Sequence, residues 1–492
     1  PGMILFSVVV LFLCAGILTP KEMLEGFSNK GMITVALLFL VSEGIRQSGT
    51  LGQVIKKLLP QGKTTVFKAQ LRILPSVAFI SAFLNNTPVV VIFAPIIKHW
   101  AKSVNLPATK FLIPLSYVTI LGGICTLIGT STNLVVHGMI LEAGFEGFSM
   151  FELGKVGIFI AIAGIIYIFL FSKRLLPDAR PDTAVPDEEV EEGEKLHRVE
   201  AVLGARFPGI NKKLKDFNFQ RHYGAEVKEI KTRNGQRFVS NLEEVVLHEG
   251  DTLVVMADDT FIPTWGESSV FVLLTNGNEP DTTGKKKRWF ALLLLVLMIV
   301  GATVGELPVT KEMFPDIKLD MFFFVSITTI IMAWTNLFPA RKYTKYISWD
   351  ILITIACAFA ISKAMVNSGV ADSVAKFIIG LSDDYGPHVL LAMVFIITNL
   401  FTELITNNAA AALAFPLALS ISAQLGVSPT PFFVVICMAA SASFSTPIGY
   451  QTNLIVQGIG NYKFTDFVRI GLPLNIITFL ISIILIPLIW NF

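Results

Sequence analysis

The triplet Asn85-Asn86-Thr87 interrupts one apolar stretch of this chain, and the triplet Thr406-Asn407-Asn408 interrupts another about 320 residues later. Uncharged Asn and Thr side chains are costly within the hydrocarbon of a membrane unless they line a cavity or a binding site. Two matched triplets therefore indicate a ligand site that two related segments of the chain build together.

A second polar motif follows each triplet after about 40 residues. Thr126-Leu-Ile-Gly-Thr-Ser-Thr-Asn133 follows the first triplet, and Thr446-Pro-Ile-Gly-Tyr-Gln-Thr-Asn453 follows the second. Upstream, Ser28–Gly49 matches Ser348–Gly369. With the crossings predicted below, the chain crosses the membrane five times between these two stretches, so the copies have opposite orientation. Inverted repeats with interrupted helices are typical of secondary transporters.

Composition places the chain in a membrane. Only 15% of its 492 residues are charged, whereas a soluble protein has about 25%, and the mean hydropathy is +0.65. Apolar runs of about 17 to 25 residues, the length that crosses a bilayer, recur along it. We find no catalytic triad, phosphate loop or metal-binding histidine spacing, and the net charge of +2 gives no argument for nucleic acid. We expect a polytopic α-helical membrane protein that is not an enzyme, with lipid around it.

Two of the apolar segments differ from simple crossings. Residues 71–98 and 388–419 each carry a polar triplet near the middle, which leaves arms of about 13 to 16 residues. At 1.5 Å per residue such arms reach about 20 to 24 Å, less than the roughly 30 Å of hydrocarbon. We therefore predict two re-entrant helical hairpins. The crossings that we predict are 3–18, 31–48, 113–137, 154–174, 289–306, 320–338, 349–366, 432–458 and 468–490.

The distribution of Lys and Arg tests this topology. The loops on the side of 46–72 hold 14 such residues, and the loops on the other side hold 5. The positive-inside rule makes the first side cytoplasmic, so we expect a bacterial inner (plasma) membrane protein with its C-terminus periplasmic or extracellular. The crossing 289–306 has a repeat counterpart that would lie before residue 1, so we also expect a further helix preceding the printed sequence.

The chain divides into three parts. We predict a first membrane repeat at 1–175, a cytosolic insert at 176–284 and a second membrane repeat at 285–492. The insert opens with an acidic, Pro-rich linker and continues as a small α+β module at about 197–262. Its alternating stretches 199–203, 225–230 and 251–256 indicate strands, and Arg233-Asn-Gly-Gln236 indicates a hairpin turn.

Such a transporter must hold a hydrophilic solute at the membrane centre. Hairpin tips and broken helices expose N-terminal N–H groups, which favour anions, while freed carbonyl and side-chain oxygens suit Na⁺. Glu403, four residues before Asn407, could carry a coupling proton or pair with a base such as Lys363.

At these motifs the chain resembles the divalent anion/sodium symporter family, over nearly the whole membrane part. It is most similar to the branch that carries TrkA-C (RCK C-terminal) modules between its halves, whose members are described as sulfate permeases. The resemblance implies Na⁺-coupled symport by an elevator motion in a homodimer. It also implies a cytosolic ligand of nucleotide type at the insert.

Carried over by motif, the resemblance implies Na⁺ sites that involve Asn85, Asn86, Gly129, Thr402, Ile405 (through its carbonyl), Asn407 and Gly449. Together with the polar motifs it predicts substrate-binding residues Asn86, Thr87, Ser131, Asn133, Asn407, Asn408, Gln451 and Asn453. Dicarboxylate carriers have two prolines where this chain has Ser131-Thr132 and Gln451-Thr452. The extra hydrogen-bond donors favour a smaller oxyanion such as sulfate, with a dicarboxylate next.

Two other classes stay open. One is a Na⁺/H⁺ antiporter or arsenite-type permease of related fold. The other is a K⁺ channel or transporter with RCK-type regulation, because Thr446-Pro-Ile-Gly-Tyr450 is similar to a potassium filter. A filter needs four such loops around one axis, and the repeat partner Thr126-Leu-Ile-Gly-Thr130 lacks the tyrosine.

Overall fold

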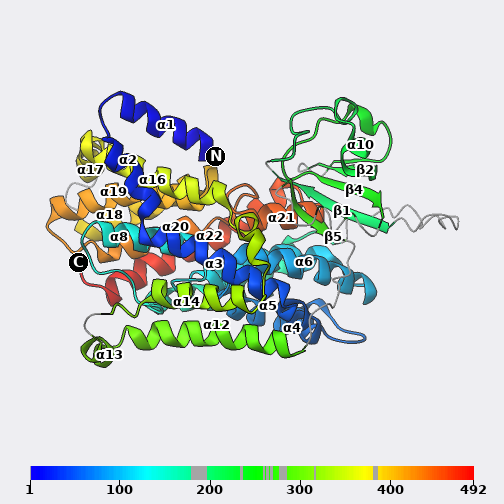
Figure 1. Cartoon of the computed structure of the whole chain (residues 1–492), viewed down its shortest axis with the longest axis horizontal. Coiled ribbons are helices and arrows are strands. Elements are labelled where there is room, and N and C mark those ends of the chain that lie inside the picture. Colours follow the sequence, from blue (N-terminus) through cyan, green and yellow to red (C-terminus); the bar gives the residue numbers. More distant parts are fainter. Residues whose placement is uncertain are drawn as a thin grey trace.

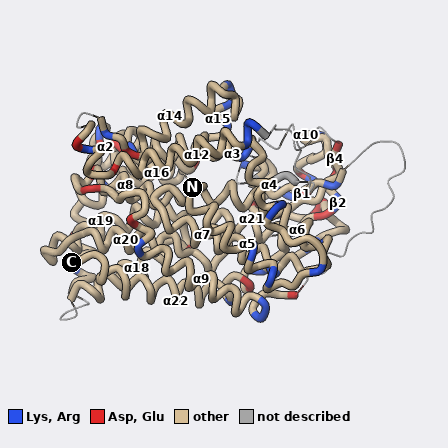
Figure 2. Tube along the Cα trace, turned by 90° about the horizontal axis from the view of Figure 1, so that it is seen from below, with Lys and Arg blue, Asp and Glu red and all other residues tan. Residues whose placement is uncertain are grey.

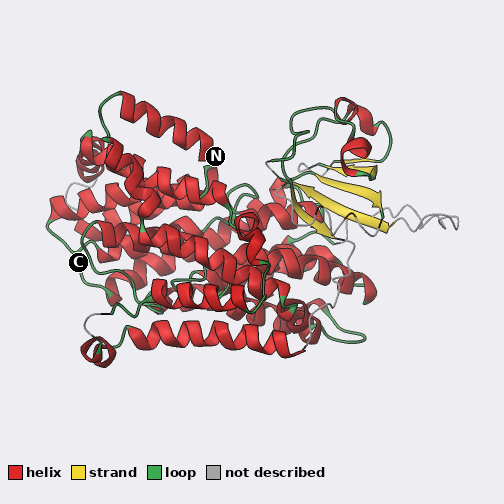
Figure 3. Ribbon diagram, in the orientation of Figure 1, coloured by secondary structure: helices red, strands yellow, loops and turns green. Residues whose placement is uncertain are grey.

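A body of helices carries a small β-sheet at one end (Figures 1 and 3). The computed structural model describes residues 2–178, 197–204, 206–232, 236–258, 261, 265, 270–275, 285–314, 317–380 and 386–492. Within these residues, seven helical segments are long and apolar enough to cross a membrane. The predicted polytopic α-helical fold with a small α+β insert is confirmed.

The first half begins with α1 and ends with α9. Asn29 starts the central helix α3, because its side chain accepts hydrogen bonds from the first free N–H groups of that helix. The elements are α1 (Gly2–Cys14), α2 (Pro20–Glu25), α3 (Lys30–Gln47), α4 (Thr50–Leu58), α5 (Val66–Ser81), α6 (Asn86–Ser103), α7 (Leu112–Gly123), α8 (Ser131–Glu142) and α9 (Gly154–Leu175).

The second half adds α12 and α13 in front and then repeats the order of the first. Asp320 caps α14 as Asn29 caps α3. The elements are α12 (Lys285–Gly305), α13 (Pro308–Met313), α14 (Met321–Trp334), α15 (Tyr343–Tyr346), α16 (Trp349–Asn367), α17 (Val370–Gly380), α18 (Gly386–Leu404), α19 (Asn407–Leu425), α20 (Thr430–Ser441), α21 (Gln451–Gly460) and α22 (Phe464–Ile489).

The internal repeat is visible in single backbone angles. Gly49 and Gly369 end their helices with φ values of 69° and 71°, and Gly16 and Asn336 occupy a second matched left-handed position with φ values of 71° and 50°. Only glycine and, less readily, asparagine adopt such angles. The two halves therefore turn at equivalent residues.

The two copies are inverted and interlocked. The equivalent helices α9 and α22 pack antiparallel: Tyr167 Oη donates to the carbonyl of Ile470 at 3.0 Å, and Trp490 Nε1 donates to Glu152 at 3.2 Å. The first helix of each set packs in the other half: α1 lies along α16 and α14 lies along α3. Each half therefore completes the other.

The two predicted hairpins are α5–α6 and α18–α19, and both are longer than predicted. Their arms have 16 to 19 residues, because the helices continue into polar flanking residues such as Lys68 and Lys102. The tips are held by contacts with the other half of the body, as described below. Arm length alone, the basis of the prediction, does not set their depth.

The insert is a five-stranded antiparallel sheet with the order β3-β2-β4-β1-β5. Its strands are β1 (His197–Leu203), β2 (Glu226–Lys231), β3 (Arg237–Phe238), β4 (Thr252–Ala257) and β5 (Phe271–Thr275), and a short helix α10 (Phe219–Tyr223) joins β1 to β2. Aromatic side chains, including Phe207, Phe217 and Tyr223, form a core separate from that of the helical body. A small independent module results.

The insert differs from its prediction in one boundary. The three predicted strands are confirmed, but β5 pairs with β1 and extends the module to residue 275, beyond the predicted end at 262. Most of the predicted linker, and residues 233–235 of the predicted turn, lie outside the described residues.

Candidate functional site

The first hairpin tip is fixed by side chains that point inward. Asn86 begins α6 and is 1% exposed. Its Oδ1 accepts a hydrogen bond from Ser81 Oγ at 2.7 Å, and Ser81 Oγ also lies 2.9 Å from the carbonyl of Thr119 on α7. The tip is therefore bonded to the first broken helix, which consists of α7, the buried loop 124–130 and α8.

The second tip repeats this arrangement. Asn407 begins α19 and its Oδ1 accepts from Thr402 Oγ1 at 3.1 Å. Thr402 Oγ1 also lies 2.6 Å from the carbonyl oxygen of Ala440 on α20. The second broken helix consists of α20, the loop 442–450 and α21. Two sites with one geometry thus lie in the opposed halves.

Each broken-helix loop is held against a tip by a threonine. Thr126 donates to the carbonyl of Ala82, and Thr446 donates to the carbonyl of Glu403 at 3.3 Å. The same hydroxyls accept from the amides of Gly129 and Gly449, at 3.1 and 3.2 Å. Carbonyl oxygens and amides of tip and loop are therefore brought into one small volume on each side.

The two predicted glycines are required by this close approach. A Cβ at Gly129 would lie 2.8 Å from the Cα of Gly123 and 3.0 Å from the carbonyl oxygen of Ala82. A Cβ at Gly449 would overlap Ser443 Oγ and lie 2.7 Å from the carbonyl oxygen of Thr402. Any side chain here would separate the loop from the tip.

Side chains of the two halves meet between the tips. Thr87 Oγ1 donates to Gln451 Oε1 at 3.3 Å, and Asn408 Oδ1 accepts from Ser131 Oγ and Thr132 Oγ1 at 3.2 Å each. Five predicted substrate-binding residues, Asn86, Thr87, Ser131, Asn408 and Gln451, therefore contact the opposite half.

Four helix N-termini start at these contacts. The helices α6, α8, α19 and α21 begin at Asn86, Ser131, Asn407 and Gln451, and all four N-cap residues are described. The N-cap residue is the one that precedes each helix, and none of the four N-cap side chains bonds to a first-turn amide of its own helix. These residues are Asn85, Thr130, Thr406 and Tyr450. Helix N-termini of this kind present N–H groups and positive dipole ends, which suit an anion.

The other predicted residues lie slightly apart. Asn133 and Asn453 are fully buried and donate into their own loops, to the carbonyls of Thr126 and Thr446 at 2.9 and 3.1 Å. Asn85 lines a small cavity that Ser131 also borders. Ile405 is part of the second tip, and its side chain is 38% exposed.

Tyr450 is a central residue that the sequence did not single out as a ligand contact. Its hydroxyl accepts from Asn86 Nδ2 at 2.7 Å, lies 2.9 Å from Thr130 Oγ1 and has the Asn407 side chain as a further hydrogen-bond neighbour. It therefore touches both hairpin tips. The signal in the sequence was that Tyr450 occupies the repeat position equivalent to Thr130.

Glu403 accepts hydrogen bonds from neutral donors rather than pairing with Lys363, and its role as a carrier of a coupling proton stays a prediction. Its carboxylate accepts from the Ser445 amide at 3.0 Å and from Asn475 Nδ2 at 2.8 Å. Neutral donors thus hold this carboxylate directly behind the second tip.

The family model described as citrate transporter matches residues 2–426 and 317–491. An uncharacterized transporter of Synechocystis sp. is 30% identical over an alignment of 570 residues, which covers 98% of this chain and 93% of that protein.

Two named cotransporters are similar over shorter stretches. Sodium/sulfate cotransporter 2 of Chlamydomonas reinhardtii is 31% identical over 57% of this chain and 31% of its own length. Solute carrier family 13 member 4 of Homo sapiens is 25% identical over 32% of this chain and 24% of its own. The chain therefore belongs to the citrate transporter family, which corresponds to the divalent anion/sodium symporters.

Proposed function

We propose that this protein is an elevator-type secondary transporter that couples Na⁺ entry to the uptake of a small divalent oxyanion, with sulfate favoured and a dicarboxylate next. The observation that carries the proposal is the convergence of four helix N-termini, two from each half, on neighbouring Asn, Thr, Ser and Gln side chains. Amide and hydroxyl donors hold an anion without a fixed positive charge, so the anion can also leave.

The cation sites would lie behind the tips. In each, the close glycine and the carbonyl oxygens of tip and loop offer the oxygen ligands that Na⁺ takes. Within the described residues, Asn133 Oδ1 near the first loop and Ser441 Oγ near the second are buried without a hydrogen-bond partner. Buried oxygens of this kind are costly unless something pairs with them. They support one cation on each side.

The proposed topology keeps the insert cytoplasmic and the C-terminus on the outer face of a bacterial inner membrane. Figure 2 supports it, since Lys and Arg gather mainly at the end of the body where α4, α5 and the insert lie. From the resemblance we carry over a homodimer and a cytosolic ligand of nucleotide type that regulates transport through the insert.

Proteoliposome uptake tests the proposal. Uptake of labelled sulfate should require an inward Na⁺ gradient, and sulfate should raise the melting temperature of the purified protein only when Na⁺ is present. Asn86→Ala and Asn407→Ala should both abolish that stabilisation. Asn105→Gly, at an exposed left-handed residue (φ 55°) that glycine accommodates, is the matched control and should keep it. An anion response that survives in both site variants would refute the assignment.

A second candidate is a Na⁺/H⁺ antiporter, and Glu403 is the observation that favours it. A carboxylate held by neutral donors beside a cation site could exchange a proton. Such a protein would move Na⁺ against a pH gradient without any anion. The same vesicles, loaded with a pH-sensitive dye, therefore separate the two functions.

A further inference from the structure

The two broken helices differ at one position in the middle of the site. Thr130 and Tyr450 are equivalent in the repeat, and both are N-cap residues with extended backbone, with φ values of −139° and −131°. One copy thus carries a short side chain and the other a phenol. The phenol is buried, since Tyr450 is 8% exposed.

The phenol lies between the tips. Its oxygen is bonded to Asn86 of the first tip and to Thr130, and Asn407 of the second tip is its third neighbour. The flanking donors Thr87 and Gln451 lie 3.3 Å apart beside it. A solute that binds both tips must therefore share this space with the ring.

We propose that Tyr450 sets the size of the transported anion, so that a compact tetrahedral oxyanion binds and an extended dicarboxylate or citrate is excluded. The inference rests on the proposed function and assigns its substrate class. A dicarboxylate places its two charged groups several bonds apart and needs the volume that the ring occupies. The hydroxyl also orients the amide of Asn86, so it contributes to affinity as well as to exclusion.

Two substitutions separate volume from hydrogen bonding. Tyr450→Thr copies the equivalent Thr130 and removes the ring, so succinate should inhibit labelled sulfate uptake at a concentration at least tenfold lower than in the wild type. Tyr450→Phe keeps the ring and should keep the exclusion, while the KM for sulfate rises several-fold. Melting temperatures of both variants verify that they fold.

Different results contradict different parts of this proposal. The size role is wrong if Tyr450→Thr excludes succinate as strongly as the wild type does, or if both variants admit it equally. It is also wrong if the wild type takes up succinate as well as sulfate, although Na⁺-coupled anion transport would then stand. A wild type that takes up no anion would overturn the proposed function itself.

An independent observation concerns where the insert sits. Gly138 on α8 and Gly458 on α21 are equivalent in the repeat. A Cβ at Gly138 would meet Asn29 and Gly31, at the start of α3. At Gly458 the three nearest atoms all come from the insert instead: Thr252 Oγ1 at 2.6 Å, the Gly250 carbonyl at 3.4 Å and Val202 at 3.7 Å.

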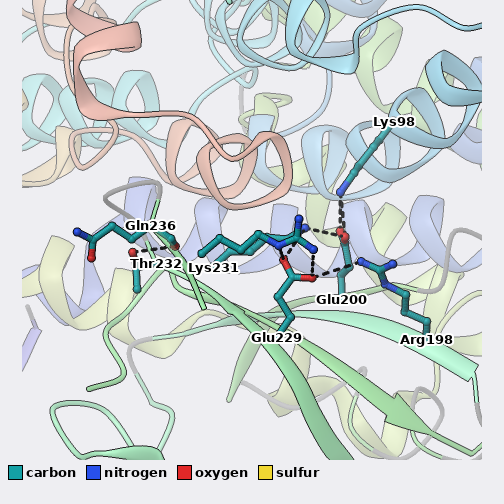
Figure 4. Close-up of polar contacts among 8 residues, drawn as sticks. Lys98, Arg198, Glu200, Glu229, Lys231, Thr232 and Gln236 are labelled. Atoms are coloured by element: carbon teal, nitrogen blue, oxygen red, sulfur yellow. Dashed lines mark hydrogen bonds and ion pairs between the residues drawn. The ribbon is translucent and has the colours of Figure 1, made fainter. Parts of the chain in front are cut away.

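Charged groups reinforce this contact. Lys98 on α6 lies 2.9 Å from Glu200 of β1, and Lys231 of β2 lies 3.4 Å from the same carboxylate (Figure 4). The insert therefore docks on α6 and α21, two of the helices that begin at the candidate site. We call these contacts the docking interface: Lys98, Leu454 and Gly458 of the body with Glu200, Val202, Gly250 and Thr252 of the insert.

In the repeat, the partners equivalent to Asn29 and Gly31 are Trp349 and Ile351, at the start of α16. Trp349 is 44% exposed. In inverted-repeat transporters the two states are reached by moving one repeat or bundle against the other around the fixed site. Because the two halves of this chain are inverted copies, we take the second state to be the one in which they exchange their packing. That exchange would bring the start of α16 onto the Gly458 face of α21, the surface that the insert covers.

From this overlap we infer that the docked insert holds the transporter in one conformation and must leave α21 before the other can form. The inference rests on the proposed function and specifies how the insert regulates it. It also explains why a module with its own core is attached to these helices.

A reversible cross-link tests the inference. In a disulfide the sulfur of one cysteine lies about 3 Å from the Cβ of the other, close to the 2.6 Å between Thr252 Oγ1 and a Cβ at position 458. Thr252→Cys with Gly458→Cys, in a variant whose four native cysteines are replaced, should therefore form a disulfide. Oxidation should stop Na⁺-driven sulfate uptake, and a reductant should restore it.

The single-cysteine variants are the controls and should show no effect of oxidation. Should the substituted glycine disturb folding, cross-linking Lys98→Cys to Glu200→Cys with a short bis-maleimide gives a second test with the same expected loss of uptake. Unchanged uptake in the fully cross-linked protein would overturn the inference. Absence of uptake in the reduced protein and the wild type alike would instead count against the proposed function.

Discussion

Glu200→Gln should weaken the docking interface. Lys98 Nζ lies 2.9 and 3.0 Å from the two carboxylate oxygens of Glu200. Burial opposes ionisation of this carboxyl, but Lys98 and Lys231 outweigh it and lower its pKa from 4.5 to about 2. Because the folded pKa lies below the unfolded one, the stabilisation is complete above about pH 4.5 and is lost as the pH falls toward 2.

The pKa shift sets the magnitude. A fall from 4.5 to about 2 corresponds to about 3 kcal/mol, which is the net effect of burial and of all charges around Glu200. Lys231 and Arg198 belong to the insert and stay with Glu200 when it leaves, so only the share of Lys98 is lost. Taking that share as about half gives roughly 1.5 kcal/mol, or about a tenfold change in the ratio of docked to undocked insert.

Hydrogen exchange of the purified protein at pH 7 measures this ratio. Backbone amides of 98–103 and 197–204 should exchange about tenfold faster in Glu200→Gln and in Lys98→Gln. The double variant should exchange no faster than either single variant, because one contact is lost in all three. Glu244→Gln, which removes a carboxylate paired with exposed Lys213, is the control and should leave this exchange unchanged.

Two results would contradict this role of the Lys98–Glu200 ion pair. One is unchanged exchange in Glu200→Gln. The other is full additivity of the two single effects, which would mean that Lys98 and Glu200 act separately. Protection should also stay constant between pH 5 and 8, since the carboxyl remains ionised across that range.

Three further predictions concern the site and its support. Gly449→Ala should reduce Na⁺-dependent uptake at least tenfold, because the new Cβ overlaps Ser443. The control Gly380→Ala should transport normally, because nothing lies within 4 Å of a Cβ at that position. Equal uptake by the two variants would contradict the role of Gly449. Glu403→Gln should raise the Na⁺ concentration for half-maximal uptake about tenfold with little change in sulfate affinity at saturating Na⁺, and an unaltered Na⁺ response would exclude the carboxylate from the cation site. Tyr117→Phe removes a 2.5 Å hydrogen bond to the Phe444 carbonyl and should lower stability by about 1 kcal/mol, seen as a lower melting temperature without loss of Na⁺ coupling.

The hairpins and broken helices could be predicted because their signals are local. Asn86 and Asn407 are polar residues in apolar segments, and Gly129 and Gly449 recur at nearly the same offset. Pairing each with its equivalent required only the repeat. The strands of the insert could be predicted for a similar reason, since alternation is a property of consecutive residues.

Contacts between distant residues could not be predicted. Tyr450 meets Asn86 across 364 residues, and nothing near either one in sequence indicates the other. Docking of the insert likewise joins Gly458 to Thr252. Glu403 was uncertain for the same reason, because Asn475, 72 residues away, provides the donor that the sequence could not identify.

The interlocked halves have a consequence for biosynthesis. Lys30 forms its ion pair with Asp320, and Asn86 donates a hydrogen bond to the Tyr450 hydroxyl. These polar groups of the first half therefore lack their partners until the last third of the chain has left the ribosome. A nascent first half therefore exposes unsatisfied groups to lipid. Membrane chaperones and proteases should meet this protein mainly as half-made chains, and truncation after residue 178 should yield a rapidly degraded product.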